Sequence, residues 1–227
     1  GCALAIEDAF RQAGFPEDVF RTIVTDHGTV AEVIARDEIQ GVSLTGSTEV
    51  GQRIAELAGR NLKKVVLELG GSDPFIVLED ADIEFTARGA VTGRTLCTGQ
   101  SCIAAKRFIV VEKVAEQFSL RFAALMSELK VGDPLDTQNN IGAMVNEQEM
   151  KTLQAQLDDA VADGAQVLCG GTRLDRPGCF YPPTVVTHTT ADMRVVKEEV
   201  FGPIAPVIVV KDQEEAVKVA NASEFGL

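Results

Sequence analysis

Hydrophobic and polar positions follow two periods along the chain. Segments with apolar residues every three or four positions are typical of amphipathic helices, and short β-branched apolar runs are typical of buried strands. The first pattern predicts helices over residues 4–13, 30–36, 49–58, 80–96, 114–129, 147–163 and 214–221. The second predicts strands over residues 22–25, 41–45, 64–68, 74–78, 107–111, 166–168, 184–186 and 204–210. This alternation predicts an α/β fold with mainly parallel sheets covered by helices.

Two local signals refine this organisation. Asp80 follows the strand predicted over 74–78 and is expected to cap the helix after it. Gly70-Gly71 follows the strand predicted over 64–68 and is a plausible boundary, because binding sites often lie where two domains meet. We therefore expect one part over residues 1–69 and another over 70–227.

The composition excludes several classes of protein. The chain has 227 residues, of which 45% are hydrophobic and 24% charged, as in ordinary soluble globular proteins. A formal net charge of −13 argues against binding to nucleic acid or to an anionic membrane. No apolar run approaches the roughly 20 residues of a membrane span. Both ends lack the pattern of a natural terminus, so we expect a piece of a longer protein.

Cysteine and histidine are used sparingly. Five cysteines make an odd number without a C-x-x-C pair, and there are only two histidines. This count argues against a zinc site, so no metal is predicted. It favours a reducing, cytoplasmic setting.

Two side chains are candidates for covalent catalysis. Glu68 ends an apolar strand, where partial desolvation would suit a general base. Cys102 follows Gly99-Gln100-Ser101, and a helix beginning there would favour its thiolate. A thiolate can attack a carbonyl carbon, and a carboxylate can activate water to release the acyl group. Taken singly, a salt-bridged Glu68 and a buried structural Cys102 are the more common interpretations of the pattern, and both stay open.

Two further segments are candidates for ligand binding. Residues 46–51 read Gly46-Ser47-Thr48-Glu49-Val50-Gly51 between a predicted strand and helix, where the first helical N–H groups can hold a phosphate. The segment is neither G-x-G-x-x-G nor a P-loop, and an ordinary turn capped by Ser47 or Thr48 stays open. Residues 198–203 place Glu199 and Phe201 before a Gly-Pro turn, where the alternative is a solvated acidic turn.

Together these motifs resemble the NAD(P)-dependent aldehyde dehydrogenase family. Glu68 and Cys102 are 34 residues apart, and Cys102 and Glu199 are 97 apart, which matches the family's order and spacing. The resemblance covers essentially the whole chain, as roughly the middle half of a typical member. The matching segments are Gly46-Ser47-Thr48-Glu49-Val50-Gly51, Leu67-Glu68-Leu69-Gly70-Gly71, Gly99-Gln100-Ser101-Cys102 and Glu199-Val200-Phe201-Gly202-Pro203.

The resemblance implies a role for each matching residue. Cys102 would attack the aldehyde to give a thiohemiacetal and then a thioacyl-enzyme, and its N–H would form half of the oxyanion hole. Glu68 would activate the hydrolytic water. The implied cofactor is NAD or NADP, bound by Gly46, Ser47, Thr48, Glu49, Val50, Gly51, Leu69, Glu199 and Phe201.

The resemblance also implies domains, substrate and assembly. Residues 1–69 would be the C-terminal part of the NAD(P)-binding domain, and 70–227 a catalytic domain truncated at its end. The substrate would be a small aldehyde, and the full-length protein a homodimer or homotetramer. Residues 67–77 and 104–109 resemble bacterial succinate-semialdehyde dehydrogenases, whose substrate carries a distal carboxylate. Arg94 is the candidate cation for that carboxylate, and a helix-surface arginine is the alternative.

Two departures from the family leave other interpretations open. Relatives usually have Asn where this chain has Cys97, which predicts altered hydrogen bonding or a Cys97–Cys102 redox link. The family's second oxyanion donor and its cofactor-binding Lys would precede Gly1, so the chain alone is expected to be a poor catalyst. The alternative is a catalytically incomplete fragment or pseudoenzyme that binds nucleotide or a full-length partner. A cofactor-free cysteine hydrolase is disfavoured because His27 and His188 lack a partner at a telling spacing.

Overall fold

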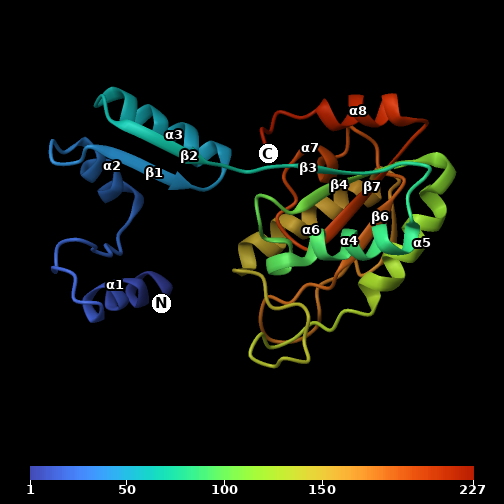
Figure 1. Ribbon diagram of the computed structural model, residues 1–227, viewed down its shortest axis with the longest axis horizontal. Coiled ribbons are helices and arrows are strands. Elements are labelled where there is room, and N and C mark those ends of the chain that lie inside the picture. Colours follow the sequence, from blue (N-terminus) through green and yellow to red (C-terminus); the bar gives the residue numbers. More distant parts are fainter. The chain divides into compact units, whose positions relative to one another are not determined.

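The computed structural model describes all residues, Gly1–Leu227, and divides them into two compact units, Gly1–Leu69 and Gly70–Leu227. Both units combine helices with a β-sheet (Figure 1). The pairs of neighbouring strands are parallel except for one, so the predicted α/β class with mainly parallel sheets is confirmed. The functional names given to the two parts of the chain stay predictions.

The first unit holds a two-stranded parallel sheet with a helix between its strands. The strands pair in register from Gly41 opposite Lys64 to Thr45 opposite Glu68. Among hydrophobic residues of this unit, only Ile34 and Ala58 are buried. Its elements are α1 (Cys2–Gln12), α2 (His27–Ala35), β1 (Gly41–Thr45), α3 (Thr48–Arg60) and β2 (Lys64–Glu68).

The strand predicted over residues 22–25 is wrong. These residues form no regular structure, and Ile23 and Val24 are 68% and 84% exposed. The Thr22 N–H donates to the Glu7 carboxylate at 2.8 Å, and the Thr22 hydroxyl donates to a carbonyl of α1 at 3.0 Å. The β-branched pattern fits a pleated surface, but a strand also needs a neighbouring strand to pair with, and this segment has none.

The second unit is built around one five-stranded sheet. Its strand order is β3-β4-β7-β6-β5, and only the β5–β6 pair is antiparallel. A single 3-10 turn, η1 (Leu96–Gly99), follows the first helix. The other elements are β3 (Asp73–Val77), α4 (Ile83–Thr95), β4 (Ala105–Val111), α5 (Glu112–Ser127), α6 (Glu147–Ala162), β5 (Gln166–Cys169), β6 (Thr184–Thr187), α7 (Arg194–Lys197), β7 (Ile204–Val210) and α8 (Gln213–Asn221).

Hydrophobic cores cover both faces of this sheet. Along β4, Phe108 and Val110 join a core formed with α4 and α5, whereas Ile109 and Val111 join a core formed with α6, α7 and α8. Because successive strand residues point to opposite faces, a strand buried on both sides reads as a continuous apolar run. The second unit therefore has three layers, with helices on each face of the sheet (Figure 1).

The helix of residues 83–95 is capped two residues later than predicted. The Asp82 carboxylate, not Asp80, accepts from the Phe85 N–H at 3.0 Å. A turn occupies the residues between β3 and the helix, with the Ala81 N–H donating to the Leu78 carbonyl at 3.2 Å. This turn places Asp82 rather than Asp80 at the position from which a side chain reaches the free N–H groups.

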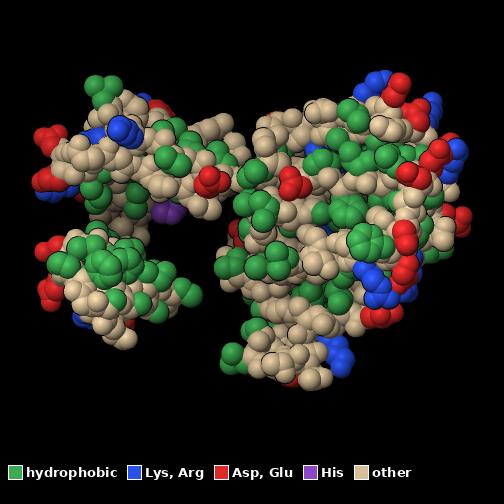
Figure 2. Space-filling view, in the orientation of Figure 1, with side chains coloured by type: hydrophobic (Ala, Val, Ile, Leu, Met, Phe, Trp, Pro, Cys, Tyr) green, Lys and Arg blue, Asp and Glu red, His purple; other side chains and the backbone are tan.

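Charged side chains of both signs alternate on the surface of the second unit. Figure 2 shows acidic and basic side chains side by side there, and Lys113 and Arg121 pair with Glu79 and Glu84. Such exposed pairs each contribute little to stability because water and salt screen them. None of the helices has the length and the apolar character required to cross a membrane.

Candidate active site

The turn of residues 46–51 lies beside the end of β2. The Gly46 N–H donates to the Glu68 carbonyl at 3.0 Å, which joins the turn after β1 to the strand that carries Glu68. The Ser47 hydroxyl caps α3 by accepting from the Val50 N–H at 3.4 Å. A Cβ on Gly51 would lie 2.5 Å from Leu69 Cδ2, so a larger residue at this position would displace the Leu69 side chain.

Glu68 does not have the environment that its strand suggested. Its side chain is exposed, so the expected partial desolvation is wrong for this structure. The reason is that β2 is a strand of a two-stranded sheet, with Val65 and Val66 also exposed. A role for Glu68 as a base stays a prediction.

The loop before Cys102 has an uncommon backbone conformation. Three successive residues, Cys97, Thr98 and Gly99, have φ values of 52°, 61° and 73°. The left-handed region costs a non-glycine residue roughly 1 kcal/mol or more. A Cβ on Gly99 would lie 2.4 Å from the Gly202 carbonyl oxygen, so this glycine permits a close approach to the segment that carries Glu199.

Cys102 lies in a turn between η1 and β4. It is half-buried, and no helix begins at it, so the expected support from a helix N-terminus is wrong. The residues after it, beginning at Ala105, pair with β3 as a strand instead. Cys97 is exposed, and both thiols are free.

A lysine beneath this turn connects it to Glu199. Lys106 has only 1% of its side chain exposed, and its ammonium donates to the carbonyls of Ser101 at 2.8 Å and Cys102 at 2.7 Å. Its third partner is Glu199 Oε1 at 3.2 Å. Burial lowers the pKa of Lys106, and the Glu199 carboxylate opposes that shift. The Gly71 N–H also donates to Glu199 Oε1, at 3.2 Å.

The packing is close at the two glycines that begin the second unit, and at Gly71 it is against backbone. A Cβ on Gly70 would lie 2.2 Å from Glu199 Oε2, and a Cβ on Gly71 would lie 2.7 Å from the Cys102 carbonyl oxygen. Real Cβ atoms essentially never approach so closely. The structure thus brings together three segments that are far apart in sequence: residues 70–71, 99–102 and 199–202.

The structure contradicts a substrate-binding role for Arg94. Its side chain is fully buried and donates to the carbonyls of Gly99 at 2.6 Å, Ala105 at 2.8 Å and Val200 at 3.2 Å. Burial lowers its pKa to about 9, and the Glu199 carboxylate opposes the shift. Because no part of the guanidinium reaches solvent, Arg94 holds the loop and does not offer a charge to a substrate.

The sequence analysis missed Lys106. It stands directly before a predicted strand whose residues 107–111 are buried in the structure. A lysine next to a strand buried on both faces needs internal acceptors, because charged groups are rarely buried without partners. That signal could have identified it. Of the other residues expected at the site, Leu69 and Phe201 are half-buried.

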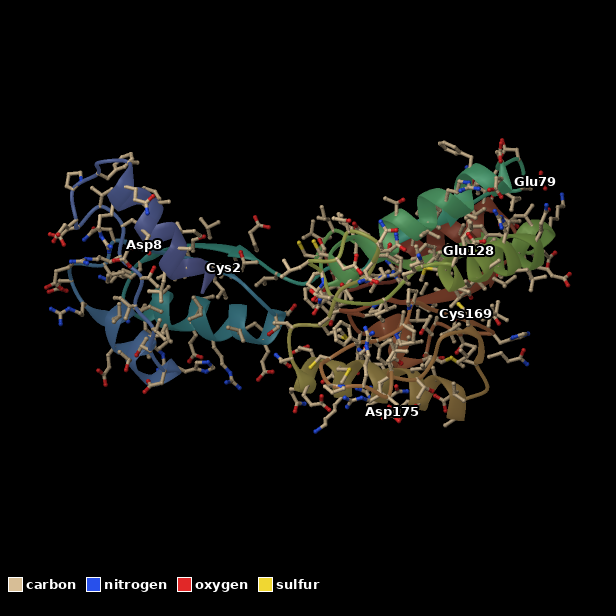
Figure 3. All side chains as sticks on the ribbon, turned by 90° about the horizontal axis from the view of Figure 1, so that it is seen from below. Cys2, Asp8, Glu79, Glu128, Cys169 and Asp175 are labelled. Atoms are coloured by element: carbon tan, nitrogen blue, oxygen red, sulfur yellow. The ribbon has the colours of Figure 1, made fainter.

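The remaining cysteines lie outside this cluster. Figure 3 labels Cys2, which is on α1 and exposed, and Cys169, which ends β5. Burial raises the pKa of the Cys169 thiol, which disfavours its reactive form. Cys179 is half-buried and within 3.9 Å of a Glu147 carboxylate oxygen. Cys102 is therefore the thiol whose backbone is held by a buried cation.

The fold and the site define an α/β protein with a half-buried thiol on a turn that a buried lysine joins to a carboxylate. A strand–turn–helix suited to anions lies in the other unit. The chain belongs to the aldehyde dehydrogenase family, which matches residues 1–227.

Individual relatives agree with this assignment. The chain is 49% identical over 225 residues to an NADP-dependent succinate-semialdehyde dehydrogenase of Deinococcus radiodurans, covering 99% of this chain and 47% of that protein. The structure matches the crystal structure of succinate-semialdehyde dehydrogenase from Burkholderia pseudomallei with a TM-score of 0.95 and 37% identity, over 98% of this chain and 46% of the other. It matches a betaine aldehyde dehydrogenase from Staphylococcus aureus in complex with NAD+ with a TM-score of 0.92 and 32% identity, over 99% and 45%. The chain spans about half the length of the relatives it matches.

Proposed function

We propose that the protein oxidises an aldehyde, succinic semialdehyde in the first instance, to the carboxylic acid with NADP+ or NAD+. The observation that carries this proposal is the joining of Cys102 and Glu199 by one buried ammonium. It gives the expected nucleophile and the expected ribose ligand a common support within one unit. The names of the relatives support both the substrate and the two cofactors.

The residues present fit a nicotinamide dinucleotide. The first turn of α3 offers backbone N–H groups after Gly46 and Ser47, as a pyrophosphate requires. Both polar contacts of Glu199 use Oε1, which leaves Oε2 to accept hydrogen bonds from a ribose. When bound, the dinucleotide supplies the acceptor for a hydride.

Cys102 and Glu68 would carry the covalent steps. The Cys102 thiolate adds to the aldehyde carbon, the carbonyl π pair moves to oxygen, and the Cys102 N–H donates to that oxygen. The oxygen lone pair would re-form the C=O bond as the hydride leaves the same carbon for the acceptor that a bound dinucleotide would supply, and a thioester would remain on Cys102. Glu68 then takes a proton from water as the water oxygen attacks the thioester carbon, the C–S bond breaks, and the acid leaves with the thiolate restored.

The experiment is a spectrophotometric assay of succinic semialdehyde oxidation with NADP+ and with NAD+. It uses both this chain and the protein at the full length of its relatives. Cys102→Ala should abolish turnover in the longer form, because it removes the proposed nucleophile. Cys179→Ala is the matched control, since it removes a thiol of similar burial outside the cluster and should retain turnover.

The outcomes separate the proposal from its alternative. Turnover by the longer protein that Cys102→Ala removes supports the proposal. Cofactor binding without turnover of any aldehyde by the longer protein would favour a pseudoenzyme that binds nucleotide. Unchanged turnover in Cys102→Ala would refute the role of the thiol.

A further inference from the structure

We propose that Lys106 is a positioning residue that fixes the backbone of Cys102 and the carboxylate of Glu199 relative to each other. The proposal concerns the site on which the proposed function rests, but its central measurement does not depend on turnover. Lys106 would act through these two residues and would not touch the substrate.

The donors and acceptors around Lys106 match in number. An ammonium has three N–H donors, and Lys106 has three acceptors within 3.2 Å: the carbonyls of Ser101 and Cys102 and Glu199 Oε1. With 1% of the side chain exposed, little water can replace any of them. Each contact is charge-assisted, which makes it stronger than a neutral hydrogen bond.

The position of Lys106 in the fold explains why it can hold the turn in place. It is the second residue of β4, and β4 lies between β3 and β7 in the sheet. The turn that carries Cys102 is neither helix nor strand, so its carbonyls lack the partners of a regular element. The Ala104 N–H donates to the Ser101 carbonyl at 3.2 Å, and Lys106 donates to the carbonyls of both Ser101 and Cys102. Lys106 therefore ties the backbone of Ser101 and Cys102 to a strand inside the sheet.

Glu199 is held from two sides at the same oxygen. Lys106 approaches Oε1 at 3.2 Å, and the Gly71 N–H donates to it at 3.2 Å. The Gly71 backbone in turn lies against the Cys102 carbonyl. A displacement of the ammonium would release both the thiol-bearing turn and the carboxylate, which a residue with a purely local structural role would not do.

Arg107 provides a matched control on the same strand. It is 4% exposed and also donates to three backbone carbonyls, those of Ser72, Val219 and Ala220, each at 2.9 Å. As the next residue along β4, it points to the opposite face of the sheet. Its removal should cost comparable stability, but it should release other segments.

The experiment compares Lys106→Met, Lys106→Arg and Arg107→Met in the protein at the full length of its relatives. Hydrogen exchange of peptides covering residues 99–105 reports how firmly the turn is held. Isothermal titration with NADP+ reports the state of Glu199. In Lys106→Met we expect exchange over 99–105 to accelerate and the NADP+ dissociation constant to rise, each by at least about tenfold, which equals about 1.4 kcal/mol.

The two other variants make the result specific. Lys106→Arg keeps a buried cation and should recover part of both effects, and it serves as the test if Lys106→Met does not fold. Arg107→Met should accelerate exchange mainly near Ser72 and in α8, with a much smaller effect than Lys106→Met on residues 99–105 and on NADP+ affinity. Equal effects of Lys106→Met and Arg107→Met on residues 99–105 would overturn the proposal, as would an unchanged Lys106→Met. Failure of the parent protein to bind either NADP+ or NAD+ would refute the proposed function, and the exchange data would still decide whether Lys106 holds the turn.

Discussion

Replacement of Arg94 by methionine tests whether a buried guanidinium holds the loop that leads to Cys102. The side chain comes from α4 and reaches the carbonyls of Gly99, Ala105 and Val200. Methionine has a similar length and is apolar, so it fills part of the volume without supplying any donor. All three carbonyls would lose their charged partner at once.

The magnitude follows from these three contacts. Leaving a buried carbonyl without a donor costs about 1–3 kcal/mol. The variant also avoids the desolvation of a buried cation, which offsets part of the loss. We therefore expect the second unit to lose about 3–5 kcal/mol of unfolding free energy, the cost of three unpaired carbonyls less the relief of desolvation. For a protein of this size that corresponds to a fall in its melting temperature of about 10 °C.

Thermal and urea unfolding followed by circular dichroism would measure this loss. Hydrogen exchange of peptides from β3, β4 and β7 would assign it to the second unit, because two units need not unfold together. Arg88→Met is the control on the same helix, since Arg88 is 63% exposed and pairs only with Glu84. We expect that control to change stability by no more than about 0.5 kcal/mol. Equal melting temperatures for the two variants would refute the view that Arg94 supports the loop.

Three other predictions follow from single residues. Glu68→Gln in the longer protein should slow deacylation, so intact-mass spectrometry after aldehyde and NADP+ should detect an acyl adduct, and unchanged turnover without adduct would remove its assigned role. Cys97→Asn should raise stability by about 0.5–1 kcal/mol in urea unfolding, because Asn tolerates the left-handed conformation better than Cys, whereas Cys97→Ala should not. Arg121 and then Arg88 lower the pKa of Glu84 from 4.5 to about 2. The ionised Glu84 carboxylate therefore stabilises the fold above pH 4.5, and this stabilisation is lost as the pH falls to about 2. Glu84→Gln should therefore reduce the dependence of melting temperature on pH in that interval.

The sheet of the second unit was predictable because its strands are buried on both faces. The strand predicted over residues 204–210 has those bounds in the structure. A run of seven apolar residues between turns is too short for most helices and fits a buried strand. The segment of residues 22–25 has a similar composition and fails, because apolar pattern reports only the preference for a pleated surface. Whether a neighbouring strand exists is a property of the whole fold.

The motifs of the site were predictable from the sequence, but the side chains that hold them in place were not. The spacing of Glu68, Cys102 and Glu199 indicated the family, and the close packing of Gly71 on the Cys102 carbonyl explains why a glycine stands there. The environments of Glu68 and Cys102 were misjudged because exposure and helix starts depend on what packs nearby. The burial of Arg94 could not be seen in a sequence where a helix-surface arginine has the same pattern.

The structure gives a physical reason for two buried cations so close to one carboxylate. A nucleophile on a turn can approach a ligand that a regular strand would exclude, but the turn does not give its carbonyls the regular partners of a helix or a sheet. Arg94 and Lys106 come from a helix and a strand, and together they supply donors to the carbonyls of Gly99, Ser101, Cys102 and Ala105. The Glu199 carboxylate opposes the lowering of the pKa of both cations. The irregular turn is thus fixed by side chains from regular elements, so its geometry should respond to substitutions at Arg94 and Lys106 more strongly than to substitutions at the exposed Cys97.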